Sequence, residues 1–152
     1  MRWTSDSVQE LPEGIMSKPQ LRPVVLICGS RGWNEREPIE RELHTLDRNT
    51  LIVHGAARGA DTLAGEIAME LGFEVMACPA DWKRYGKAAG IVRNKQMLDE
   101  YRPQLVIAFV RSIANSPGSM HTINTARKMG IATRVHLPTQ NPSSDTEGET
   151  EG

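Results

Sequence analysis

The sequence lacks the features that mark several large classes of protein. None of its apolar runs approaches the roughly 20 residues of a membrane-spanning helix, which excludes a helical membrane protein. The first residues lack the continuous apolar core of a secretory signal, so we expect a cytoplasmic protein. Two cysteines are too few for a disulfide framework, and neither they nor the four histidines have a metal-ligand spacing. The formal net charge of −1 gives no support to a protein built mainly to bind nucleic acid.

The two ends of the 152-residue chain differ in composition from its middle. Residues 1–22 show no apolar period of 2 or 3.6 and are interpreted as a flexible leader, in which Met16 is an alternative start. Residues 138–152 have no apolar side chain beyond proline and carry four uncompensated carboxylates, without which the formal charge becomes +3. Such a segment cannot bury enough apolar surface to offset its ordering entropy, so we predict a disordered acidic tail. Residues 23–137 remain as one domain.

Within this domain, short apolar runs alternate with amphipathic segments. Short apolar runs typical of strands buried on both faces occur at 24–28, 51–54 and 105–110, and two further strands are predicted at 73–77 and 133–136. Segments with one apolar helical face lie between them, at 38–47, 61–71, 90–101 and 121–129. This alternation predicts an α/β fold, a single doubly wound domain with a five-stranded, mostly parallel sheet. For a strand order of 3-2-1-4-5, ligands would bind at the carboxyl edge between the first and fourth strands.

The loop after the first strand is the first candidate for a binding site at that edge. Gly29 permits a close backbone approach to a ligand, Ser30 offers a hydroxyl, and Arg31 offers a planar fork for phosphate. The alternative is an ordinary strand-to-helix turn with an exposed arginine. Because the three spaced glycines of the dinucleotide fingerprint are absent, we expect no NAD-type cofactor, and no other cofactor is indicated.

The loop after the second strand is the second candidate. Gly55 and Gly59 would leave the free amides of the following helix open to an anion, and Arg58 is predicted to contact a phosphate. Asp61 either accepts a hydrogen bond from a ribose hydroxyl or simply caps the helix. The spacing of a P-loop is absent, which disfavours ATP hydrolysis.

Two further segments complete the predicted site. The first opens the last helix and offers phosphate or ribose contacts, unless it is only a capped helix start; its candidate residues are Pro117, Gly118, Ser119 and Thr122. The second, residues 81–94, interleaves four basic residues with Trp82 and Tyr85, a mixture that can bind a base and its phosphates or single-stranded nucleic acid. A solvated basic loop is the alternative. The candidates here are Lys87, Arg93 and Asn94.

Five segments in this order resemble those of the YspA/YpsA-related SLOG family. They are CGSR at 28–31, HGAARGAD at 54–61, PADW at 79–82, YGKAAG at 85–90 and Arg93-Asn94. The resemblance covers residues 23–137 and implies a Rossmann-like domain that binds nucleotides or nucleotide-derived ligands. It also implies a phage or mobile-element protein. The related Lonely Guy (LOG) phosphoribohydrolases form dimers, so a homo-oligomer is expected.

One motif departs from the LOG enzymes. Their Pro-Gly-Gly-x-Gly-Thr-x-x-Glu motif corresponds to PGSMHTINT at 117–125, in which Ser119 and His121 replace glycines and Thr125 replaces the catalytic glutamate. A threonine cannot supply the carboxylate that would stabilise a ribosyl cation, so phosphoribohydrolase activity is in doubt and no catalytic residue is assigned.

Three hypotheses of function follow. The leading one is a module that senses or sequesters a nucleotide-derived small molecule at the carboxyl edge of the sheet. The first alternative is a nucleotide-processing hydrolase of the LOG type, with Asp61 as its acid. The second is single-stranded DNA binding through residues 83–93, as the fold resemblance to the DNA-processing protein DprA suggests, although a charge of +3 is small for it.

Overall fold

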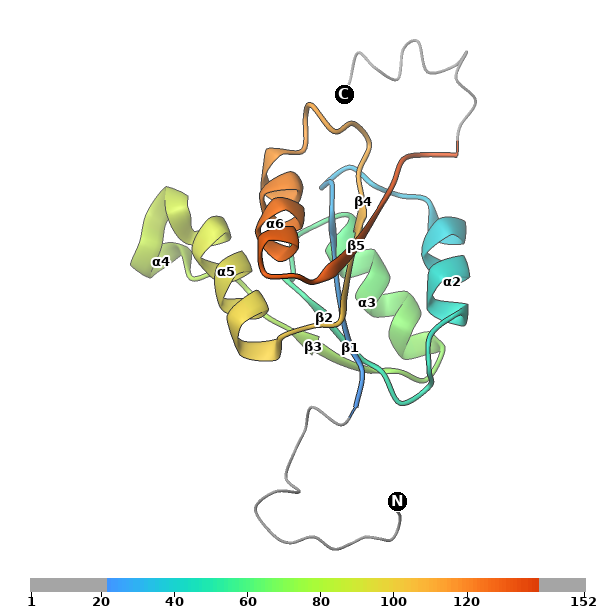
Figure 1. The fold of residues 1–152 in the computed structure, drawn as a ribbon. Helices are drawn as coiled ribbons and strands as arrows, with labels where there is room; N and C mark the ends of the chain where they lie inside the picture. The colour runs from blue at the N-terminus through green and yellow to red at the C-terminus, as the bar shows by residue number, and fades with distance from the viewer. Residues whose placement is uncertain (1–21, 140–152) are drawn as a thin grey trace, which may run out of the picture.

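Five strands form one sheet in the computed structural model, which describes residues 22–139 (Figure 1). The strand order is β3-β2-β1-β4-β5, as predicted from the sequence, and every neighbouring pair is parallel. The predicted α/β class is therefore confirmed, with a sheet that is entirely parallel. The strands are β1 (Val24–Gly29), β2 (Leu51–His54), β3 (Glu74–Ala77), β4 (Leu105–Phe109) and β5 (Ala132–His136).

Helices cover both faces of the sheet (Figure 1). One face carries α2 (Arg36–His44) and α3 (Ala60–Glu70), and the other carries α5 (Ala89–Tyr101) and α6 (Pro117–Lys128). A short helix, α4 (Trp82–Tyr85), and a 3-10 turn, η2 (Gly86–Ala88), precede α5. Figure 1 shows α4 projecting from the body of the molecule. None of the helices within residues 22–139 is long and apolar enough to cross a membrane.

The central strands separate two apolar cores. On the α2–α3 side, Ile27 and Phe109 are completely buried, and on the α5–α6 side Leu26 and Val106 are completely buried. Successive residues of β1 thus enter opposite cores, which explains why its sequence is apolar without interruption. The edge strands β3 and β5 are partly exposed.

All four helices that the sequence pattern predicted begin earlier than expected, two of them by more than one residue. The last helix, expected from residue 121, begins at Pro117, because proline fits the first helical turn and its missing N–H would be unpaired there in any case. The first helix occupies 36–44 instead of 38–47. Apolar periodicity locates the buried middle of a helix and is weak at its polar first turn, which accounts for both shifts.

The predicted leader and tail lie almost entirely outside the described residues. At the inner border of the leader, Arg22 forms an ion pair with Glu74 of β3 at 2.8 Å. At the border of the tail, Thr139 donates hydrogen bonds to Oε1 of Glu35 from its N–H at 3.1 Å and from its hydroxyl at 2.9 Å. The boundaries predicted at residues 22 and 138 therefore each cut off a residue that contacts the domain.

Deletion of residues 140–152 is expected to leave the melting temperature nearly unchanged. The deletion spares Thr139 and its bonds to Glu35, and it removes no residue of either apolar core. Thermal denaturation followed by circular dichroism would check this. A fall of many degrees would contradict the prediction.

Candidate functional site

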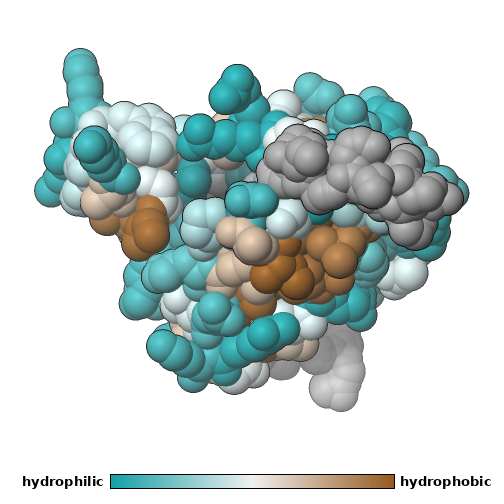
Figure 2. All heavy atoms as spheres, turned by 90° about the horizontal axis from the view of Figure 1, so that it is seen from above, coloured by the Kyte–Doolittle hydropathy of each residue, from teal (hydrophilic) through white to brown (hydrophobic). Residues whose placement is uncertain are grey.

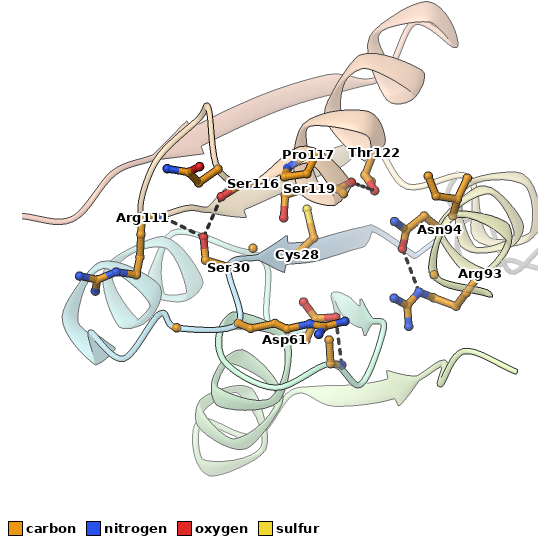
Figure 3. A pocket seen from close by; sticks show the side chains of 18 of the residues that line it. Cys28, Ser30, Asp61, Arg93, Asn94, Arg111, Ser116, Pro117, Ser119 and Thr122 are labelled. Atoms are coloured by element: carbon orange, nitrogen blue, oxygen red, sulfur yellow. Dashed lines mark hydrogen bonds between the residues drawn. The ribbon is translucent and has the colours of Figure 1, made fainter. Parts of the chain in front are cut away.

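A pocket opens where the order of the strands reverses, beyond the carboxyl ends of β1 and β4 (Figure 3). Its volume of about 590 Å³ lies within the usual range for small-molecule sites. Its walls come from the β1–α2 loop, the first turn of α3, the segment from α4 to the first turns of α5, and the start of α6. This is the crevice in which doubly wound proteins bind their ligands.

Most of the residues predicted as ligand contacts line this pocket. Those that the fold brings together are Gly29, Ser30, Arg31, Asp61, Lys87, Arg93, Asn94, Pro117, Gly118, Ser119 and Thr122. Gly55, Arg58 and Gly59 lie outside it. Segments far apart in the sequence thus meet at one edge of the sheet.

The two glycines outside the pocket shape its walls. The carbonyl of Gly55 accepts a hydrogen bond from Nη1 of Arg93, and a Cβ at Gly55 would lie 2.7 Å from that guanidinium. Gly59 has a φ of +77°, and a Cβ there would lie 2.3 Å from the carbonyl oxygens of Ser30 and Arg31. The space that each missing side chain leaves is therefore filled by protein atoms.

Arg58 points elsewhere than predicted. Its side chain is exposed and contributes to a second, smaller hollow, together with Trp33 and Glu66. Ala57, its neighbour, lines the main pocket. The loop after β2 therefore directs successive residues to different surfaces, which its glycine-rich sequence does not reveal.

Ser30 joins the loops that follow β1 and β4. Its N–H donates to the carbonyl of Phe109 at 3.0 Å, and its Oγ accepts from the N–H of Arg111 at 2.9 Å. The same Oγ lies 2.9 Å from Oγ of Ser116 (Figure 3). Because Ser30 accepts from a backbone amide, its own proton is available to Ser116. Ser30 thus holds two walls of the pocket together.

Asp61 is a buried carboxylate in the pocket wall. It is only 4% exposed, and its Oδ2 accepts from the N–H of Gly55 at 2.9 Å and of Ala57 at 3.4 Å. Its Oδ1 has no hydrogen-bond partner among residues 22–139. Burial raises the pKa of Asp61 to about 6, although the two backbone N–H groups and the charge of Arg93 oppose this rise. Asp61 therefore holds the preceding loop through Oδ2 and has a second oxygen that can accept a further hydrogen bond.

Arg93 ties the start of α5 to the ends of two strands. Its Nη1 donates to the carbonyls of Gly55 and Cys78, the latter at 3.3 Å, and its Nε donates to Oδ1 of Asn94 at 2.8 Å (Figure 3). All of these acceptors are neutral. Within the described range, no carboxylate lies at ion-pair distance from Arg93, and Asp61 acts on its pKa only as a nearby charge.

Positive charge predominates in the pocket. Arg31 and Lys87 are exposed there and form no ion pair in the part of the chain that the structure describes. Together with Arg93 they exceed the single negative charge available from Asp61. The site therefore suits an anionic ligand.

The start of α6 adds backbone donors to the same wall. The N–H groups of Gly118 and Ser119 have no acceptor within residues 22–139, and Pro117 before them has no N–H. Ser116, the N-cap, makes no side-chain capping bond. Unpaired amides at the positive end of a helix dipole favour an anion.

Cys28 lies under this wall and was not predicted as part of the site. Burial raises the pKa of its thiol, which interacts with the side chain of Ser119. A buried, protonated thiol is a poor nucleophile, so Cys28 forms part of the floor. Arg111 and Asn115 also line the pocket without having been predicted, and their only signal in the sequence is that they follow a strand of the sheet centre. Ser116, which begins the segment predicted to open the last helix, lines the pocket as well. No group of three or more His, Cys, Asp or Glu side chains within 22–139 is arranged to hold a metal ion.

Two comparisons with known proteins find sequences related to this chain. The family model described as YspA, cpYpsA-related SLOG family matches residues 23–85, which include the β1–α2 and β2–α3 loops. The chain is also similar to the Gene 61 protein of Mycobacterium phage D29, with 36% identity over 116 residues. That alignment covers 70% of this chain and 90% of the phage protein. The resemblance seen in the sequence and the expected kinship with phage proteins are both confirmed.

Proposed function

Because the chain belongs to the YspA, cpYpsA-related SLOG family, we propose that it binds a nucleotide or nucleotide-derived ligand and so senses or sequesters it. The observation that carries this proposal is the concentration of anion-binding groups in one pocket at the strand-order reversal. Arg31, Lys87 and Arg93 contribute charge, and α6 contributes unpaired amides. Family membership supports a nucleotide-related role.

The groups of the pocket suggest how the ligand is held. Arg93 and the amides of Gly118 and Ser119 would bind the phosphate, because a guanidinium and a helix N-terminus both form charge-assisted hydrogen bonds with it. The free Oδ1 of Asp61 would accept a hydrogen bond from a ribose hydroxyl.

Calorimetry with the full chain tests this proposal. AMP, GMP, CMP and UMP are the ligands, and the corresponding nucleosides are matched controls that lack only the phosphate. Nucleoside monophosphates are expected to bind more tightly than nucleosides, with an affinity that falls as salt is added. Failure of every phosphate-bearing ligand to bind would overturn the proposal.

A hydrolase is the second candidate, and Asp61 favours it. A carboxyl group with a pKa of about 6 and a free oxygen in a pocket has the properties of a general acid or base. Thr125, which replaces the catalytic glutamate of the LOG motif, does not line the pocket and offers no carboxylate. Incubation with nucleoside monophosphates and chromatography of the free base would detect turnover, which should be lost in Asp61→Asn.

We also expect a homodimer, as the resemblance to LOG-like domains implies. Light scattering at micromolar concentration should then give twice the monomer mass of 16.8 kDa. A monomer mass would contradict this expectation. Single-stranded DNA binding through residues 83–93 is less favoured, and salt-dependent retention of an oligonucleotide would support it.

A further inference from the structure

Two exposed apolar side chains line the pocket beside its polar groups. Trp82 at the start of α4 is 53% exposed, Ile91 in the first turn of α5 is 46% exposed, and both line the cavity. Viewed from above the sheet, Figure 2 shows apolar surface on the projecting α4–α5 part of the molecule at the left. Exposed apolar groups in a hollow with a polar rim are a common sign of a ligand site.

The two aromatic rings of α4, those of Trp82 and Tyr85, differ in their contacts. Trp82 has no ring contact and no hydrogen-bond acceptor for its Nε1 among the described residues. By contrast, the guanidinium of Arg84 covers the ring of Tyr85, the other aromatic residue of α4, at 5.3 Å from its centroid. The two rings of this short helix thus differ in that only Tyr85 already has a partner.

The backbone beside Trp82 keeps the indole accessible. Asp81 caps α4 by accepting a hydrogen bond from the N–H of Arg84 at 3.1 Å, which fixes the turn that carries Trp82. At Gly90, a Cβ would lie 3.9 Å from Cη2 of Trp82, so the indole lies across a residue that has no side chain. The exposed part of Trp82, 53% of the residue, is the surface available to a second flat ring.

We propose that Trp82, with Ile91 beside it, is the platform on which the ligand's base stacks, so that the site selects nucleobase-bearing phosphates over sugar phosphates. This inference rests on the proposed function, because it assumes that the polar wall holds the phosphate. Base–aromatic stacking contributes enough free energy to change affinity about tenfold or more, and it is strongest for the larger bases. Trp82 is therefore the specificity-determining residue, and purine nucleotides bind more tightly than pyrimidine nucleotides.

The test compares AMP with ribose 5-phosphate on the full chain and its variants by calorimetry. The wild-type protein is expected to bind AMP at least tenfold more tightly than ribose 5-phosphate. Trp82→Ala should lower the affinity for AMP to that for ribose 5-phosphate and leave the latter unchanged. Trp82→Phe should retain most of the preference, because the phenyl ring still stacks. Tyr85→Ala is the matched control on the same helix and should change neither affinity.

The outcomes separate this inference from the proposed function. If ribose 5-phosphate binds as tightly as AMP, or if Trp82→Ala loses affinity for both equally, the stacking platform is refuted while phosphate binding stands. If neither compound nor inorganic phosphate binds, both the stacking platform and the proposed function are refuted. Circular dichroism of each variant checks folding. Should Trp82→Ala not fold, the comparison of AMP with ribose 5-phosphate on the wild-type protein still tests the inference, because equal affinities would refute it.

Discussion

Replacing Asp61 with asparagine is expected to stabilise the folded protein at pH 7 by roughly 2–3 kcal/mol. Burial raises the pKa of this carboxyl from 3.8 to about 6, and each unit of such a shift corresponds to about 1.4 kcal/mol. Asparagine keeps an oxygen that can accept from the N–H of Gly55 and removes the buried charge. The same change should weaken ligand binding, since an amide nitrogen, which donates and cannot accept a hydrogen bond, takes the place of the free Oδ1.

The effect of Asp61 on stability depends on pH in a defined direction. Because its pKa is higher in the folded than in the unfolded protein, the folded state binds the proton more tightly between about pH 4 and pH 6. The contribution of Asp61 to the free energy of unfolding is therefore largest below pH 4 and falls as the pH rises through this window. Above it, the difference between wild type and Asp61→Asn should be constant.

Urea denaturation at pH 4, 5, 6 and 7 measures this difference. The curves of the wild type and Asp61→Asn should approach each other near pH 4 and separate towards pH 7. Asp99→Asn is the control, because Asp99 is exposed on α5 and, among residues 22–139, pairs only with Lys95 on the surface, at 2.9 Å. Surface ion pairs of this kind contribute little to the free energy of unfolding. A constant difference between wild type and Asp61→Asn across the range would contradict a raised pKa.

The fold was predictable from the sequence because burial leaves a direct pattern. Residues of β1 alternate between two apolar cores, so the run from Val24 to Cys28 could only be a central strand of a covered sheet. The apolar pattern predicted the start of α6 only from residue 121, because Pro117, Gly118 and Ser119 carry no apolar signal. Similarly, residues 82–88 have no apolar periodicity from which α4 and η2 could be predicted, because the residues of both elements are largely exposed.

The site was predictable as a set of loops, but not in the direction of each side chain. Strand order determines which loops meet, and this brought Ser30, Asp61 and Arg93 to one pocket as expected. Whether an arginine in such a loop faces the ligand depends on contacts between distant segments. Arg93 is placed by the carbonyl of Gly55, 38 residues earlier in the chain, whereas Arg58, next to Gly59, is exposed at another hollow.

Arg93→Ala is expected to weaken the binding of nucleoside monophosphates by about ten- to a hundredfold. Hydrogen bonds to charged groups contribute about 1.5–3 kcal/mol each, and the guanidinium is half-buried in the pocket wall without a carboxylate partner among residues 22–139. The loss of its hydrogen bonds to Gly55 and Cys78 should also reduce the free energy of unfolding by about 1 kcal/mol. Melting curves would measure that reduction separately from affinity.

Two further variants test whether the loss of affinity in Arg93→Ala is due to the guanidinium of Arg93. Arg93→Lys keeps the charge but lacks the planar fork, so it should restore only part of the affinity. Arg58→Ala removes the same type of side chain from the exposed loop after β2 and should leave the affinity for AMP unchanged, because Arg58 does not line the pocket. Calorimetry with AMP compares the three variants directly. A large loss in Arg58→Ala together with wild-type affinity in Arg93→Ala would place the phosphate at the β2–α3 loop, one of the segments predicted from the sequence to contact it, and would remove Arg93 from the site.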